Sequence, residues 1–405
     1  MNPTERLYYD DPLRLAFDAT VLDAHGDTVV LDASAFYPES GGQLADRGTL
    51  AGRSVVDVQV DEGGVVRHTL APLPAHDAPA PEPVLAPGAR VHGEVERARR
   101  RLHMALHTGQ HILSAALLEV ARADTTSSRL GESACTIDLG GLAPNEALVA
   151  RAEELANAVV DDDLPVRAYF PGAAELAALS LRRKAKVERD VRVVAIGDFD
   201  LSPCGGTHCL RTAQVGLVAV TGIERYKGGT RVSFAAGARA RRALGSDSAA
   251  LRALARELSC GPADVREGLE KLRRELADVR GELGRARGDL AHELGDALVA
   301  RAAPGSELVV GELADPALLR AVASRVTSLP GRVALLAAPV EGGLHVLAAR
   351  AEGSRFDCGA FVKRAAAATG GRGGGRPEHA EGRLGSGATW TALVAELSAA
   401  AAAGR

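Results

Sequence analysis

The chain has 405 residues, 46% of them hydrophobic and 25% charged, a composition typical of two or more globular domains with substantial cores. The polar N-terminus does not resemble a signal peptide, no run of about 18 apolar residues occurs, and five irregularly spaced cysteines favour a reducing compartment, so we expect a cytoplasmic protein with no membrane span. The net charge of −4 excludes a globally basic nucleic-acid binder, and any such role must depend on local patches.

Residues 1 to about 70 predict a β-rich, barrel-like unit, because short alternating segments rich in Val and Thr are separated by Gly or Asp turns. The segment FYPESGGQLADRG, 36–48, interrupts this pattern. Gly41 and Gly42 let the backbone approach a ligand closely, and Gln43 offers an amide there. A plain β-turn with Gln43 on the surface fits the same residues. A Pro/Ala-rich connection follows at 71–89.

The next unit contains two motifs that predict a metal centre. HTGQH, 107–111, lies in an apolar run with helical periodicity, so His107 and His111 share one face of a helix. CGGTHC, 204–209, places Cys204 and His208 around a Gly-Gly turn. Three imidazoles and one thiolate suit one tetrahedral zinc ion per chain. Four protein ligands leave no vacancy at such an ion.

Two neighbours of these motifs bear on the kind of site. His103 precedes His107 by four residues, and spacing alone does not decide which histidines bind the metal. Thr108 stands where zinc proteases of the HExxH type carry a Glu, which excludes that class. Four arginines precede the histidines: Arg97, Arg99, Arg100 and Arg101. They could form a solvent-exposed face of the helix, or they could contact phosphate groups of a nucleic acid.

Between and after the motifs, the pattern predicts an α+β unit. We expect a strand pair at 126–142, a helix at 144–163 capped by Asn145, a strand at 164–172, a helix at 173–187, a strand at 189–200 that enters CGGTHC directly, and a hairpin at 214–237.

From residue 244 the chain predicts a helical segment with a heptad seam, followed by a small α/β unit from 304. The seam consists of Val265, Leu269, Leu272, Leu276, Val279, Leu283, Ala286 and Leu290. Three glycines weaken this helix, so the seam needs a partner, either an antiparallel helix such as 247–259 or a second subunit. In the last unit, a glycine-rich loop with Arg372 and Arg376 could approach a phosphate backbone, although a flexible turn fits equally well.

Several motifs together resemble a known family. FYPESGGQ with ADRG, HTGQH, TIDL, VRVVAIGDFD, CGGTHC and GGTRVSF resemble the editing domain shared by alanyl-tRNA synthetases and free-standing AlaX-type editing proteins. GGRGGGRPEHAEG resembles the C-terminal domain of alanyl-tRNA synthetases. The expected fold class is α+β, with a β-rich domain at 1–92, a zinc-containing editing domain at 93–243, a coiled-coil segment at 244–303 and an α/β domain at 304–405.

The resemblance implies a cytoplasmic, zinc-containing aminoacyl-tRNA hydrolase of the long AlaX form, which deacylates mischarged tRNA(Ala) in trans. Its substrates would be chiefly Ser-tRNA(Ala), then Gly-tRNA(Ala). The zinc ligands would be His107, His111, Cys204 and His208, and His103 falls outside the motif.

We assign further roles on the same basis. Gln43 and Thr136 are expected at the catalytic site, and a contact from them to the serine hydroxyl would reject alanine. Gly41, Gly42 and Arg231 are expected to bind the substrate. Arg100, Arg372 and Arg376 are expected to bind tRNA, and residues 265–290 to form a homodimer. Cys209 and His379 depart from the family pattern without affecting the metal ligands.

Two alternatives remain open at this stage. A related deacylase would act on Ser-tRNA(Thr), although the GGQ segment and the alanyl-type C-terminus argue against it. A non-catalytic tRNA-binding protein would use zinc for stability alone.

Overall fold

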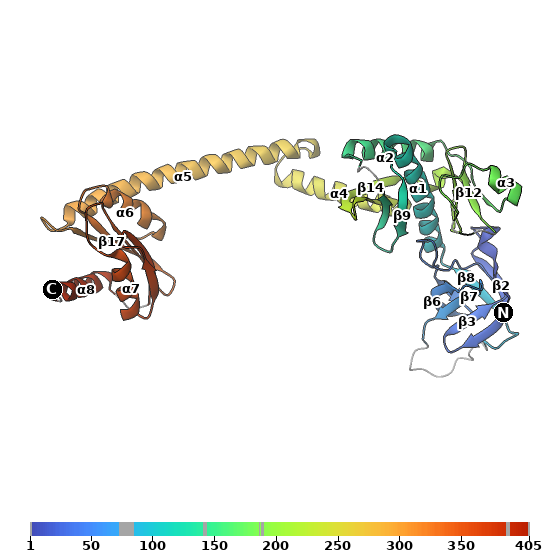
Figure 1. Ribbon diagram of the computed structural model, residues 1–405, viewed down its shortest axis with the longest axis horizontal. Helices are drawn as coiled ribbons and strands as arrows, with labels where there is room; N and C mark the ends of the chain where they lie inside the picture. The colour runs from blue at the N-terminus through green and yellow to red at the C-terminus, as the bar shows by residue number, and fades with distance from the viewer. Residues whose placement is uncertain are drawn as a thin grey trace. The chain divides into compact units, whose positions relative to one another are not determined.

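The computed structural model describes residues 2–72, 85–140, 144–185, 187, 190–385 and 389–403 (Figure 1). The chain divides into two compact units, residues 1–253 and 254–405. The predicted Pro/Ala-rich connection lies mostly outside the described residues. Within the described part, no helix combines the length and apolar character that crossing a membrane requires.

The first unit begins with a closed six-stranded barrel, as the alternating pattern predicted. Its strands are joined in the order β2 (Ala16–His25), β3 (Thr28–Leu31), β7 (Val66–Leu70), β6 (Arg53–Val60), β5 (Gly48–Leu50) and β8 (Arg90–Val95). The predicted domain boundary at residue 92 falls inside β8, which closes the barrel by pairing with β2 and β5. Two short segments, β1 (Glu5–Arg6) and β4 (Ala33–Ser34), pair in parallel beside it, and a 3-10 turn, η1 (Leu7–Tyr9), follows β1.

A long helix and a sheet form the second layer of this unit. Helix α1 (Arg97–Ala121) buries Leu106, Leu113 and Leu117 against a four-stranded sheet. The strand order in this sheet is β14 (Val218–Tyr226), β15 (Gly229–Ala236), β10 (Cys135–Leu139), β9 (Thr125–Leu130). Helix α2 (Glu146–Asp161) begins at the predicted cap, where the Asn145 side chain accepts a hydrogen bond from the Leu148 amide.

A second, three-stranded sheet of β11 (Val166–Tyr169), β12 (Val193–Ile196) and β13 (Asp200–Pro203) corrects two predictions. The expected helix at 173–187 is only the short α3 (Ala173–Ala178), because none of its side chains is buried and packing does not extend it. The expected single strand entering CGGTHC is two strands, because the chain turns at Gly197 with a φ of 49° and β13 pairs back onto β12.

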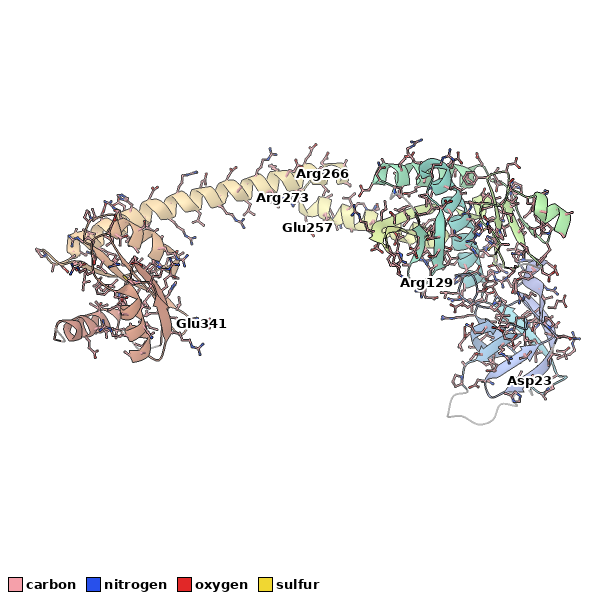
Figure 2. The ribbon with its side chains drawn as sticks, viewed as in Figure 1. Asp23, Arg129, Glu257, Arg266, Arg273 and Glu341 are labelled. Carbon is pink, nitrogen blue, oxygen red and sulfur yellow. The ribbon has the colours of Figure 1, made fainter. Side chains whose placement is uncertain are left out.

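The helical segment contains the predicted seam on a single long helix. Helix α4 (Gly237–Glu257) spans the predicted boundary at 243, and α5 runs from Val265 to Arg301. Arg266 and Arg273 project outward from α5 in Figure 2. The apolar seam side chains are also exposed, by 41% at Leu269 and up to 60% at Val279. Among the described residues, therefore, no helix covers the seam, and the predicted coiled-coil pairing stays a prediction.

The C-terminal unit is a five-stranded sheet between two helical layers. The strand order is β16 (Leu308–Glu312), β17 (Val333–Val340), β18 (Gly343–Arg350), β20 (His379–Leu384), β19 (Arg372–Gly375). Helices α5 and α6 (Leu319–Thr327) pack on one face, and α7 (Cys358–Ala368) and α8 (Trp390–Ala403) on the other.

The glycine-rich segment expected to be a loop is strand β19. A Cβ at Gly373 would lie 2.7 Å from Val362 on α7, and a Cβ at Gly375 would lie 2.5 Å from the Cα of Ala380. Gly373 therefore allows the strand to lie close under α7, and Gly375 allows it to lie close to the neighbouring strand β20.

Arg100 corrects a site prediction, because it is fully buried and cannot reach a tRNA phosphate. Its guanidinium donates to the Asp46 carboxylate and to the backbone carbonyls of Pro12 and Ala35. Asp46 is buried as well and accepts from the amide of Tyr37. This ion pair joins the first turn of α1 to the loop between β4 and β5.

Replacing Arg100 should destabilise the first unit. In Arg100→Met the Asp46 carboxylate loses its buried partner, and such a loss costs about 3–5 kcal/mol. We expect a lower free energy of unfolding in urea, whereas Arg97→Met, at an exposed position of the same turn, should leave it nearly unchanged. Equal effects of the two substitutions would contradict a structural role for Arg100.

The exposed seam on α5 provides a test of the predicted homodimer through 265–290. Leu276→Glu combined with Leu283→Glu places charge on two seam positions and should convert a dimer into a monomer in sedimentation velocity. Arg280→Glu, on the same helix but outside the seam, should leave the dimer intact. A wild-type chain that sediments as a monomer at all concentrations would contradict the prediction.

Candidate metal centre and active site

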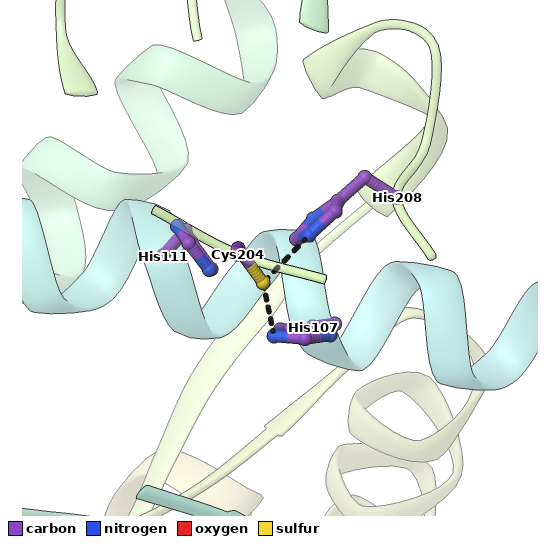
Figure 3. A group of neighbouring side chains, drawn as sticks. All are labelled: His107, His111, Cys204 and His208. Carbon is purple, nitrogen blue, oxygen red and sulfur yellow. Dashed lines mark hydrogen bonds between the residues drawn. The ribbon is translucent and has the colours of Figure 1, made fainter. Parts of the chain in front are cut away.

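The structure brings the four predicted metal ligands together (Figure 3). His107 and His111 lie one turn apart on α1, and Cys204 and His208 lie on the loop after β13. The sulfur of Cys204 is 3.3 Å from the Nε2 atoms of both His107 and His208. One candidate ligand atom from each of the four residues lies within 4.8 Å of the others. We call these four residues the His/Cys cluster.

Each imidazole of the cluster is oriented through its other nitrogen. The Nδ1 of His107 is 2.7 Å from the side-chain oxygen of Gln43, and the Nδ1 of His111 is 3.1 Å from Asp200. The Nδ1 of His208 is 3.3 Å from the hydroxyl of Thr108. A proton on each Nδ1 would complete these contacts and leave every Nε2 lone pair free for a metal ion.

The pKa values of Cys204 and His208 are shifted toward the forms that bind metal. At His111, burial disfavours the charged ring, but Cys204 and Asp200 outweigh burial and raise its pKa. Burial disfavours the Cys204 thiolate, but the charges of the neighbouring imidazoles outweigh burial and hold the thiol pKa well below its usual value. Burial, together with the adjacent His107, lowers the pKa of His208 to about 3, so this ring is neutral. Thiolate and neutral imidazole are the metal-binding forms of these side chains.

One buried atom without a partner supports a bound ion. The Nε2 of His111 is buried and has no hydrogen-bond partner among the described residues. Zinc bonds of about 2.0 Å to nitrogen and 2.3 Å to sulfur, at a tetrahedral angle, separate the two ligand atoms by roughly 3.5 Å. The observed N–S separations of 3.3 Å are close to this value. The donor set and its spacing therefore fit zinc.

The loop CGGTHC is held against α1 by contacts that only a glycine permits. A Cβ on Gly206 would lie 2.2 Å from the ring of His107, closer than any real contact. Arg192, directly before β12, donates to the carbonyls of Cys204 and Gly206 at 3.1 and 2.8 Å. The loop backbone thus lies against the imidazole that it helps to position.

Gln43 is fully buried, which contradicts its alternative placement on the surface. Its amide nitrogen donates to the Thr207 hydroxyl at 2.8 Å, and its oxygen accepts from the Thr207 amide at 3.1 Å. The same oxygen faces His107. Gln43 therefore connects the loop of residues 36–48 to both halves of the cluster.

A cavity of about 640 Å³ opens beside the cluster. Gly41 and Gly42 form part of its wall, and a Cβ on Gly42 would lie 2.6 Å from the carbonyl of Ser128 on β9. His107 and Cys204 reach the cavity, so a bound ion would lie at its edge. Its charged lining consists of Arg6, Arg183, Lys184, Arg192 and Asp190. This excess of cations suits a ligand that carries phosphate groups.

Two predicted site residues lie away from the cluster. Burial alternates along β10 and directs Ile137 toward the core under α1, so Thr136 lies on the opposite face of the sheet and does not line the cavity. Arg231 forms a two-pronged ion pair with Asp138, at 2.7 and 3.0 Å, and stacks over the ring of Tyr226.

In the C-terminal unit, Arg372 and Arg376 are exposed. Cys209 is buried, and burial raises its thiol pKa to about 11, as expected of a packed residue.

Sequence reasoning missed the residues that support the ligands. Asp200 contacts His111 and receives hydrogen bonds from Arg182 at 2.6 Å and Ser202 at 3.0 Å. Burial alone would raise the Asp200 pKa, but His111 and Arg182 lower it to about 2. Thr108 and Thr207 lie inside the two motifs, next to the predicted ligands His107 and His208. A hydroxyl residue directly beside a metal ligand is the sequence feature that could have identified them as supporting residues.

The comparisons first define a class of domain. Residues 191–233, which include CGGTHC, match the family model described as the threonyl and alanyl tRNA synthetase second additional domain.

More particular relatives share most of this chain. An alanine–tRNA ligase of Halorubrum lacusprofundi is 33% identical over 94% of the chain, and that of Archaeoglobus fulgidus is 32% identical over 94%. The alanyl-tRNA editing protein AlaX-L of Pyrococcus horikoshii is 35% identical over 58% of the chain. The chain spans 42% of the length of each ligase and 59% of AlaX-L. The resemblance predicted from the motifs, to alanyl-tRNA synthetases and AlaX-type proteins, is confirmed.

A matched pair of substitutions tests the metal centre. His107→Gln should abolish zinc binding, because it removes a ligand, whereas His103→Gln, one turn earlier on α1, should retain one zinc per chain. Asp200→Asn should weaken zinc binding by roughly 10- to 100-fold, because the support of His111 is lost. Metal content by mass spectrometry and chelator competition measure both effects. Equal zinc content in the two His variants would contradict the assignment.

Proposed function

We propose that this protein is a zinc-containing hydrolase that deacylates mischarged tRNA(Ala), chiefly Ser-tRNA(Ala) and then Gly-tRNA(Ala). The observation that carries the proposal is the buried His/Cys cluster at the edge of a cation-lined cavity. The similarity to alanine–tRNA ligases, over 94% of the chain, and to AlaX-L, over 58% of it, points to the aminoacyl ester as the bond that is cleaved.

The chemistry needs a group that binds the amino acid and a cavity that holds the ribose ester. Zinc, when bound, would supply a Lewis acid for the ester carbonyl or an anchor for the amino acid. Gly41 and Gly42 would let the ester lie against backbone. Gln43 has both amide atoms engaged, and we assign it the positioning of His107 rather than contact with the substrate.

Selection of serine over alanine requires a polar contact to the serine hydroxyl. Ser127 and Ser128 on β9 both line the cavity, but the Ser127 hydroxyl already donates to Asp138 at 2.7 Å. Ser128 pairs with Ile137 and therefore shares its face of the sheet, and we propose the Ser128 hydroxyl for this contact in place of Thr136. A site that bonds the hydroxyl leaves polar groups unpaired when alanine binds, which gives discrimination of roughly 10⁴-fold. The exposed Arg372 and Arg376 would contact the tRNA body from the C-terminal unit.

The number of candidate ligands favours a second function, tRNA binding with a zinc ion that is only structural. Four protein ligands form a closed coordination shell, which is typical of structural zinc. The chain would then be a tRNA-binding protein without hydrolytic activity. A third reading, deacylation of Ser-tRNA(Thr), is compatible with the family model, which covers both threonyl and alanyl enzymes.

A deacylation time course separates these functions. We expect rapid loss of serine from Ser-tRNA(Ala), retention of alanine on Ala-tRNA(Ala) and slow loss from Ser-tRNA(Thr). His107→Gln should lose activity while its circular-dichroism spectrum stays close to that of the wild type, and His103→Gln should remain active. Zinc-loaded wild-type protein that binds tRNA but hydrolyses none of the three substrates would support the binding protein instead.

A further inference from the structure

An aromatic cluster extends from the core of the first unit to the cavity beside the His/Cys cluster. Aromatic residues are only 3% of the chain, yet four of them meet here. The ring centroids of Tyr37 and Tyr8 are 5.4 Å apart, those of Tyr8 and Tyr9 4.8 Å, and those of Tyr9 and Phe170 5.5 Å. Tyr8 and Tyr37 are buried, whereas Phe170 is 50% exposed. Phe170 is therefore the exposed end of a packed aromatic series.

The position of Phe170 is fixed by the structure around it. It follows β11 directly, and Tyr169, its neighbour, is held in register opposite Val193 on β12. The Tyr9 ring packs against it edge-on, at an interplanar angle of 71°. Tyr9 is itself held by a hydrogen bond from Arg6 at 2.8 Å and lies under the guanidinium of Arg192. An exposed ring held in this way can stack against a flat ligand with little loss of side-chain freedom.

Cationic side chains line the same cavity. Arg6, Arg183, Lys184 and Arg192 contribute to its lining together with Phe170, and Asp190 is the single acidic residue in that lining. Arg6 and Arg192 are engaged with Tyr9, whereas Arg183 and Lys184 line the cavity without contributing to the Tyr9 contacts. An aromatic face beside Lys and Arg side chains is the combination that binds single-stranded nucleic acid, where bases stack and phosphates pair with Lys and Arg.

We infer that Phe170 is the stacking platform for the terminal adenine of the tRNA, with Arg183 and Lys184 binding the phosphates of the preceding nucleotides. This inference rests on the proposed function, since it places the single-stranded 3′ end in the cavity. The ester on the terminal ribose then lies toward His107 and Cys204, which line the same cavity. Phe170 stacks on the π-face of the terminal adenine, which all tRNAs share, so it does not distinguish one tRNA from another. Selection of the amino acid is left to the part of the cavity next to the His/Cys cluster.

Stacking is measured directly with a fluorescent base. An acceptor-stem minihelix that carries no amino acid, and that has 2-aminopurine in place of its terminal adenine, should lose fluorescence when it binds the wild-type protein. Phe170→Trp should preserve the quenching, whereas Phe170→Leu, which keeps an apolar side chain but removes the π-face, should abolish it. Leu22→Ala, at an exposed apolar position of the barrel, is the control and should behave as the wild type.

Kinetics and salt dependence provide the second readout. Phe170→Ala should raise KM for Ser-tRNA(Ala) roughly 10-fold with little change in kcat, within the range known for base–aromatic stacking. The double variant Arg183→Ala with Lys184→Ala should make the salt dependence of minihelix binding shallower, by about 0.7 in the log–log slope for each lost phosphate contact.

The outcomes distinguish this inference from the proposed function. Ser-tRNA(Ala) hydrolysis by the wild type, with no quenching and an unchanged KM in Phe170→Ala, would overturn the platform and leave the hydrolase standing. Quenching that depends on Phe170, in a protein that hydrolyses no ester, would support the platform and refute the hydrolase. If Phe170 instead binds another protein, the minihelix would show no quenching, and the salt dependence of its binding would not change in the Arg183 and Lys184 variant. This result would also overturn the inference.

Discussion

The hydrogen bonds of the Gln43 amide are the contacts on which the geometry of the site depends. One side chain reaches His107, 64 residues away in sequence, and Thr207, 164 residues away. An amide has a donor and an acceptor end, so it can hold the imidazole of one segment and the hydroxyl and backbone of another at the same time. Because Gln43 is fully buried, these bonds do not compete with water, and leaving any of them unmade is costly.

A buried ion pair plays a comparable part at the other end of α1. Arg100 and Asp46 lie in the same segments as His107 and Gln43, and their pairing fixes the first turn of the helix relative to the loop of residues 36–48. Polar contacts of this kind are directional, whereas the apolar packing of α1 against its sheet tolerates small shifts. The Arg100–Asp46 ion pair and the Gln43 hydrogen bonds therefore fix the orientation of the histidines. The apolar packing of α1 stabilises the helix itself.

The sequence predicted the secondary-structure elements and the candidate metal ligands better than it predicted the residues that hold those ligands in place. Rough alternation predicted the barrel, and helical periodicity predicted α1. The two motifs indicated the metal centre, and the family resemblance excluded His103 and left the four cluster residues. The failures have local physical causes. The apolar pattern at 173–187 suggested a helix, but the helix is only Ala173–Ala178 and none of its side chains is buried. The glycines at 373–375 suggested a loop, but they belong to a strand, and Gly373 allows it to fit under α7. Arg100 belonged to a run of arginines, and only the fold shows that its neighbour is Asp46 rather than a phosphate. Asp200 and Phe170 have no motif, since their roles come from three-dimensional neighbours.

The distance between the ligand pairs along the chain has a consequence for biosynthesis. His107 and Cys204 are separated by 97 residues, so the ribosome must add the whole three-stranded sheet of β11, β12 and β13 before a metal ion at the cluster could acquire a sulfur ligand. Domains generally fold as they emerge, N-terminal parts first. The barrel can close early, but α1 must wait with its buried polar face incomplete until the loop after β13 arrives. Ion capture would then become possible only after β13 has been made, and β14 (Val218–Tyr226) and β15 (Gly229–Ala236) must still be added to complete the sheet on which α1 packs.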